Sequence, residues 1–336
     1  TATTTTQPPT SASNSYDSST PAGASTVPVQ MDSTNSLLVT NPTGTGIENY
    51  PLQFGRPFRR GEVSQCPEVF YRGVAVPAQV DVKNRWDDGS LRFAVISVVL
   101  PSIGAGERAT IDLKPKTSCD TAAGLTAEQM LASFDFDATI ALNGGAAGKA
   151  SAREMLAAGA YWRWTNGPVN TTAIIEDHAN KRFDFGLDAN KSLRPVFHVQ
   201  FWPKAGVYRV RAIVEQSDTT KLQNQDYSVR VTKGYGAPAV AYEKAAVTHI
   251  YGSRWTRDFW VGRDLPELSV QHNIGYLAST KALPNFDARF TLSQQSKVAL
   301  LTAWAGQAKD IYDAGLWQKA MGTAGGGADI RVGASW

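Results

Sequence analysis

The side chains best suited to proton transfer lie between positions 254 and 276 of the chain. A lyase that cleaves a uronate polymer needs a base to remove the proton next to a carboxylate and a cation to neutralise that carboxylate. His272 and Tyr276 could supply the base, and Arg254 could supply the cation. The four-residue spacing of His272 and Tyr276 predicts that both lie on one helical face. The alternative is a packing role, in which His272 binds a backbone carbonyl and Tyr276 lies beneath a sheet.

The tryptophans offer a second chemistry, the stacking of sugar rings on aromatic faces. Trp162 and Trp164 are two residues apart, so the alternation of a β-strand places both on one face. Together with Trp202 and Trp260 they are the candidate glycan-binding residues. The alternative is that Trp162 and Trp164 both belong to the core.

No motif for metal or cofactor binding is present. The four histidines are scattered at positions 178, 198, 249 and 272, and the two cysteines are far apart, so no zinc-ligand spacing occurs. We therefore expect no metal and no cofactor. Cys66 and Cys119 flank a block of predicted strands and could form a disulfide that stabilises it by roughly 2–5 kcal/mol. Such a bond would suit an extracellular protein, and two unpaired thiols are the alternative.

The charge balance argues against nucleic acid as a partner. The 336 residues include 33 basic and 30 acidic side chains, which gives a net charge of +3, and no basic run is longer than Arg59-Arg60. Proteins that bind nucleic acid carry a basic patch or stripe, so we expect no such partner. The uncharged run at residues 93–100 is too short to span a bilayer, and we expect no membrane insertion.

A β-hairpin at residues 74–100 is the clearest predicted element. In residues 74–82 every second side chain is Val or Ala, with Ala, Pro, Gln and Asp between them, the period of a strand that has one wet face. Asp87, Asp88 and Gly89 predict the turn, because glycine adopts the positive φ that tight hairpin turns need. The returning strand carries no charge over residues 93–100, which predicts burial of both of its faces. Pro101 should end it, since proline gives the ladder no N–H.

Beyond this hairpin, the pattern predicts a mainly β protein with four segments. We expect a flexible Thr/Ser/Pro-rich arm at residues 1–34, because residues 1–30 carry a single charge and cannot bury enough apolar area to offset their ordering entropy. Short strands with close turns predict a small antiparallel barrel at 35–115. A second antiparallel β-domain should cover 116–250. The last segment, 251–336, should be helical, with a long helix over 293–321 whose apolar face includes Val298, Leu301 and Ile311.

Four strings in the first 92 residues carry a resemblance to a known family: PLQFGRPF at 51–58, GEV at 61–63, VPAQV at 76–80 and RWDDGSLR at 85–92. Residues 48–115, about a fifth of the chain, resemble the N-terminal RIFT-barrel domain of exo-rhamnogalacturonan-lyase-like proteins. The resemblance implies a RIFT-like barrel in a large secreted bacterial or phage-encoded protein that faces glycans. In that family the barrel supports a helical toroid, so 251–336 is expected to be a truncated or reduced toroid.

Three functional hypotheses follow. The first is a structural or receptor- or glycan-facing component of an extracellular or virion assembly, such as a phage tail or surface filament, whose residues 1–30 contact a neighbouring subunit. The second is the N-terminal portion of a polysaccharide lyase that uses His272, Tyr276 and Arg254. The third is a non-catalytic module that binds a polysaccharide through Trp162 and Trp164.

Overall fold

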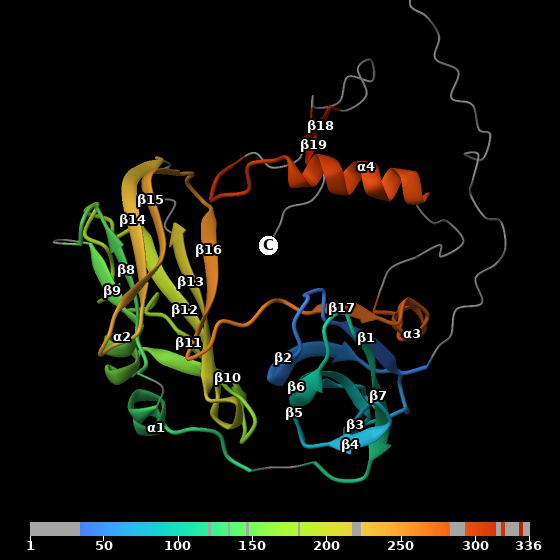
Figure 1. Cartoon of the computed structure of the whole chain (residues 1–336). Helices are drawn as coiled ribbons and strands as arrows, with labels where there is room; N and C mark the ends of the chain where they lie inside the picture. Colours follow the sequence, from blue (N-terminus) through green and yellow to red (C-terminus); the bar gives the residue numbers. More distant parts are fainter. Residues whose placement is uncertain are drawn as a thin grey trace, which may run out of the picture. The chain divides into compact units, whose positions relative to one another are not determined.

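The structure is a computed structural model that describes residues 34–119, 122–133, 135–145, 148–180, 182–216, 223–282, 293–313, 317–319 and 329–331 (Figure 1). The chain divides into two compact units, and the described residues of the smaller one are 293–306. Of the predicted arm at residues 1–34, residues 1–33 lie outside the described residues. As predicted, the protein is mainly β, with several antiparallel sheets and few helices. No helix among these residues is long and apolar enough to cross a bilayer.

Two antiparallel sheets form what we call the first β region. One contains, in spatial order, β17 (Ser269–His272), β1 (Ser36–Thr40), β7 (Arg108–Lys116), β3 (Cys66–Tyr71) and β4 (Val74–Val76). The other contains β2 (Ile47–Pro57), β6 (Leu91–Ile103) and β5 (Ala78–Arg85). Both contribute to a single core that includes Phe54, Ile96, Val98 and Ile111. Among the described strands the two hydrogen-bond ladders do not join into a closed barrel.

The predicted hairpin forms with two differences from expectation. The turn lies where predicted, with Gly89 at φ 82°, and β6 is buried on both faces over most of its length. The first arm, however, divides at Pro77, so that β4 pairs with β3 in one sheet and β5 pairs with β6 in the other. The prediction that Pro101 ends the returning strand is wrong. Pro101 lies opposite Asn49, which has a positive φ, and these two residues are left out of the pairing between β2 and β6. Because no ladder hydrogen bond is needed at that position, the strand can continue through the proline.

The second β region also consists of two antiparallel sheets. Its larger sheet contains β10 (Tyr161–Asn166), β11 (Thr171–Ile175), β12 (Leu193–Trp202), β13 (Val207–Gln216) and β16 (Arg254–Val261). Its smaller sheet contains β15 (Ala239–His249), β14 (Gln225–Lys233), β8 (Ala138–Leu142) and β9 (Lys149–Ser151). Short helices α1 (Ala127–Ala132), α2 (Ala152–Ala157) and η1 (Pro203–Ala205) complete it. The core between the sheets includes Ile140, Phe197, Val199, Val210 and Val231.

The predicted helical segment at 251–336 differs most from the structure. β16 belongs to the larger sheet of the second β region, and β17 returns to the first β region and pairs with β1. Among the described residues of this segment the helices are α3 (Ile274–Ser279) and α4 (Gln294–Ala305), and two further short strands pair, β18 (Trp317–Lys319) with β19 (Asp329–Arg331). Trp255 and Phe259 of β16 pack in one core and Trp260 packs in the other, and this burial favours a strand over a helix there.

The predicted helix over 293–321 ends at Ala305, before Gly306. Ile311, which was expected on its apolar face, is buried in the core of the second β region instead. Asp310 explains the change, since it accepts hydrogen bonds from Tyr242 (2.7 Å) and from Arg257, and Lys244 donates to the Ile311 carbonyl (3.0 Å). These polar contacts hold the segment against β15 and β16, and a continuing helix could not make them.

Candidate functional site

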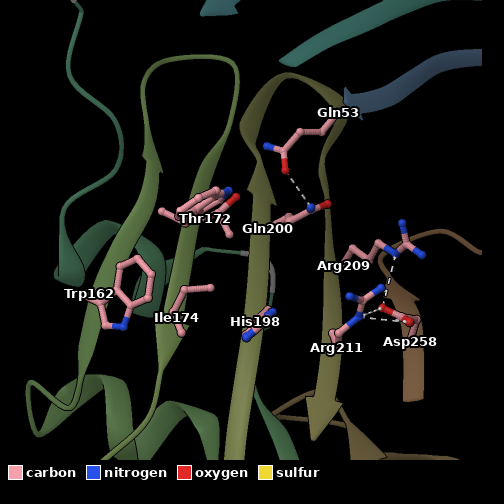
Figure 2. A pocket seen from close by; sticks show the side chains of 10 residues that line it. Gln53, Trp162, Thr172, Ile174, His198, Gln200, Arg209, Arg211 and Asp258 are labelled. Atoms are coloured by element: carbon pink, nitrogen blue, oxygen red, sulfur yellow. Dashed lines mark hydrogen bonds and ion pairs between the residues drawn. The ribbon is translucent and has the colours of Figure 1, made fainter. Parts of the chain in front are cut away.

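One face of the five-stranded sheet β10–β11–β12–β13–β16 carries a continuous row of side chains that could bind a ligand. Every second residue of these strands points away from the core of the second β region, and we call this side the open face. Trp162 pairs with Ile174, Ile174 with His198, His198 with Arg211, and Arg211 with Asp258. Figure 2 shows these five side chains on one side of the sheet. At about 4.8 Å between strands, the row is roughly 19 Å long.

The open face is hollowed into a pocket of about 390 Å³, which is a typical size for a ligand site. Its lining comes from six strands: Gln53 of β2, Trp162 and Trp164 of β10, Thr172 and Ile174 of β11, His198 and Gln200 of β12, Arg209 and Arg211 of β13, and Asp258 of β16. A smaller hollow of about 230 Å³ shares Arg209 and Asp258 with it. Both β regions therefore contribute to the pocket.

Both tryptophans of β10 line the pocket, and the second of them lies in a β-bulge. The pairing register of β10 with β11 shifts between Arg163 and Thr165, so Trp164 is the extra residue of the bulge. Trp162 and Trp164 are 47% and 40% exposed, and their rings meet edge to face with centroids 6.2 Å apart. Lys83 covers part of Trp164, with its ammonium 4.1 Å from the ring centroid. The pair thus presents exposed aromatic surface at one end of the pocket.

The opposite end of the pocket is charged. Arg211 Nε donates to the Asp258 carboxylate at 3.0 and 3.3 Å, and Arg209 pairs with Glu267 at 2.8 Å. The terminal amino groups of Arg211 have no hydrogen-bond partner among the described residues. A guanidinium with two parallel N–H groups available can bind a carboxylate in bidentate fashion.

His198, at the centre of the row, is neutral at physiological pH. Its pKa is lowered to about 4, chiefly by burial and then by the positive charges of Arg211 and Arg254, while Asp258 opposes them. A neutral imidazole offers one hydrogen-bond donor and one acceptor. A base with so low a pKa removes protons poorly at neutral pH, so this arrangement favours binding over proton abstraction.

Of the four tryptophans predicted to bind glycans, the structure brings only Trp162 and Trp164 into the pocket. Trp202 is 0% exposed and packs in the core of the first β region, so the prediction of a glycan contact there is wrong. Trp260 is 6% exposed in the same core and only borders the smaller hollow. Both rings fill the space where the two β regions meet, which strand alternation alone could not show.

The predicted lyase residues do not form one open site. His272 is the last residue of β17 and Tyr276 lies in α3, so the prediction that they share a helical face is wrong. They do meet around the buried Arg56, which donates to His272 Nδ1 (3.0 Å) and lies 4.2 Å from the centre of the Tyr276 ring. Arg254 lies elsewhere, on β16, where it is opposite Glu215 of β13 in the strand register.

This cluster is enclosed. Tyr276 is 0% exposed and its hydroxyl donates to Glu62 at 2.6 Å, while burial and then this bond raise its pKa. Burial lowers the pKa of Arg56 to about 10, and burial and then Arg56 lower the pKa of His272. A substrate would have no access to the Tyr276 hydroxyl in this arrangement.

Sequence reasoning missed His198, Gln200, Arg209, Arg211 and Asp258. The available signal was alternation, since β12 reads VFHVQFW and β13 reads VYRVRAI over part of their lengths. Polar residues at every second position within otherwise apolar strands indicate a sheet with one open face. Which strands are neighbours was not contained in that signal.

The part of the chain that the structure describes has no group of three or more His, Cys, Asp or Glu side chains placed to hold a metal. A scan against models of known protein families gives no match, and neither does a search of curated proteins.

Proposed function

We propose that the protein binds glycans through the open face of its second β region and that the preferred sugar carries a carboxylate. The observation that supports this most strongly is the row from Trp162 to Asp258. It changes along its length from exposed aromatic, through aliphatic and neutral polar, to the ion pair of Arg211 with Asp258. A pyranose ring has an apolar C–H face and polar edges, and such a gradient matches both.

The site suits binding better than bond cleavage. The exposed indoles of Trp162 and Trp164 can stack on a sugar ring, and Arg211 can receive a carboxylate. His198 is too weak a base for proton abstraction at neutral pH. We therefore favour the non-catalytic hypothesis over uronate cleavage, and the resemblance to glycan-facing lyase proteins implies the same class of ligand.

We further propose an extracellular location, which the disulfide between Cys66 and Cys119 supports because such bonds persist in oxidising compartments. A role in a virion or surface assembly, with residues 1–30 contacting a neighbouring subunit, stays a prediction because those residues lie outside the described ones.

Titration calorimetry with trigalacturonate, a short acidic oligosaccharide, tests the binding proposal. We expect wild-type protein to bind it, and Trp162→Ala and Arg211→Gln each to weaken binding by about tenfold or more, since each removes a major contact. Tyr251→Ala is the matched control, because Tyr251 is an exposed aromatic residue outside the pocket.

Two results would contradict the proposal. One is the absence of binding by the wild-type protein to trigalacturonate. The other is binding that Trp162→Ala and Arg211→Gln leave unchanged, which would place the ligand elsewhere.

A further inference from the structure

Two glutamine side chains, one from each β region, meet at the edge of the pocket. Gln53 belongs to β2 and Gln200 to β12, and Gln200 Nε2 donates to Gln53 Oε1 at 2.9 Å (Figure 2). Both side chains line the pocket and are partly exposed. A glutamine amide has two N–H donors and one carbonyl acceptor, so its recognition properties depend on which way it faces.

A fully buried asparagine fixes the orientation of Gln53. Asn170 Nδ2 donates to the Phe201 carbonyl (3.3 Å), which can only accept, so Asn170 Oδ1 must face the other way. Gln53 Nε2 donates to this oxygen at 3.0 Å and to Ser97 Oγ at 3.0 Å. Both N–H groups of Gln53 are therefore engaged, and its carbonyl is turned toward Gln200.

The orientation of Gln200 follows from that of Gln53. Since Gln53 presents an acceptor, Gln200 must direct one N–H toward it. This leaves Gln200 Oε1 and the second N–H of Gln200 without a hydrogen-bond partner among the described residues. The amide thus offers the pocket one acceptor and one donor side by side. Two neighbouring sugar hydroxyls can satisfy this pair, because one can donate while the other accepts.

Resting on the proposed function, we infer that Gln200 recognises a pair of adjacent, unsubstituted hydroxyl groups on the bound sugar, and that Gln53 is the positioning residue that holds it in this orientation. Sugars whose hydroxyls are esterified lose the donor that Gln200 Oε1 requires. A buried or half-buried acceptor left without its donor costs affinity. The site therefore discriminates against O-acetylated sugars, and the first β region takes part in the selection through Gln53.

The experiment compares trigalacturonate with the same oligosaccharide acetylated on O2 and O3, both titrated calorimetrically. We expect wild-type protein to bind the acetylated form about tenfold more weakly. Gln200→Leu should weaken binding of the unacetylated form and bring the ratio of the two affinities close to one. Gln53→Leu should reduce the same ratio, because Gln200 would then be free to rotate. Gln271→Leu, on β17 outside the pocket, is the control and should keep the wild-type ratio.

The outcomes separate this inference from the proposed function. If wild-type protein binds both forms equally, or if Gln200→Leu still discriminates, the inference is wrong while the glycan-binding function stands. A retained ratio in Gln200→Leu would mean that the acetyl groups are excluded by shape rather than by the amide. If wild-type protein binds neither form, both the function and the inference are wrong.

Discussion

At the residue scale, Gln79 joins the two β regions through a single buried side chain. Its Oε1 accepts from the backbone N–H groups of Val169 (3.0 Å) and Asn170 (2.9 Å), and its Nε2 donates to the Asn170 carbonyl (2.9 Å) and to Asp81 (2.7 Å). A Cβ at Gly167 would lie 2.4 Å from Gln79 Cδ, so the turn before β11 must contain glycine there. The pocket depends on this junction, because Asn170 also anchors Gln53.

We predict that Gln79→Ala lowers the free energy of unfolding by about 2–4 kcal/mol, since it leaves the buried N–H groups of Val169 and Asn170 without their acceptor. Urea denaturation followed by fluorescence measures the change. Gln271→Ala removes an exposed glutamine and serves as the control. A loss of less than about 0.5 kcal/mol in Gln79→Ala, in the range of ordinary surface substitutions, would contradict this account.

At the element scale, the disulfide ties together the ends of a 53-residue stretch of the first β region. Cys66 opens β3 and Cys119 follows β7, and these strands are neighbours in one sheet with Cys66 paired to Lys116. The Cα atoms of the two cysteines are 5.3 Å apart, a usual distance for a disulfide. Strand pairing, rather than closeness in sequence, brings the two cysteines together.

The double substitution Cys66→Ala and Cys119→Ala should lower the free energy of unfolding by about 4 kcal/mol, the loop-closure value for a stretch of this length. Guanidinium denaturation with and without dithiothreitol measures it. Reductant should destabilise the wild-type protein by a similar amount and leave the double variant unchanged. A wild-type protein insensitive to reductant would argue that the bond contributes nothing.

At the scale of the whole molecule, the titratable groups favour a stability plateau near neutral pH. Burial lowers the pKa of His198, His249 and His272. Burial is what lowers the pKa of His249, and the bond from its Nε2 to the Ser253 carbonyl (3.0 Å) opposes that shift. In the neutral ring, Nδ1 accepts from Tyr227 (2.8 Å). At the other end of the pH scale, burial raises the pKa of buried tyrosines, including Tyr227.

The signs of these shifts give the pH dependence. A histidine whose pKa is lower in the folded state binds its proton preferentially when the protein is unfolded. Its contribution to the stability of the protein is therefore fully present above about pH 6.5, the pKa in the unfolded chain. That contribution falls as the pH drops toward about 4, the pKa of His198 in the folded protein. A tyrosine whose pKa is raised in the folded state gives up its proton more readily when the protein is unfolded, so the protein loses stability above about pH 10.

We therefore predict a melting temperature that is nearly constant between about pH 7 and 10 and falls on either side. Differential scanning calorimetry across pH 4–11 tests this. The variant His198→Gln should show a shallower acid limb, because it lacks one of the protons taken up on unfolding. An unchanged limb between pH 4 and 6.5 in that variant would disprove the contribution of His198.

The sequence by itself determined the local features: the β class, the turn at Asp87, Asp88 and Gly89, and the shared strand face of Trp162 and Trp164. Each depends on residues a few positions apart, where alternation and turn chemistry act directly. The helices expected from residue spacing at 254–276 and around Ile311 do not form as predicted, because packing against distant strands outweighed the local pattern.

Only the tertiary structure decided which side chains form the site. His198, Arg211 and Asp258 come from three strands, and Gln53 comes from more than a hundred residues earlier in the chain. Strand order and register are set by the burial of whole sheet faces and by long-range partners such as Gln79 and Asn170, and no local pattern contains that information.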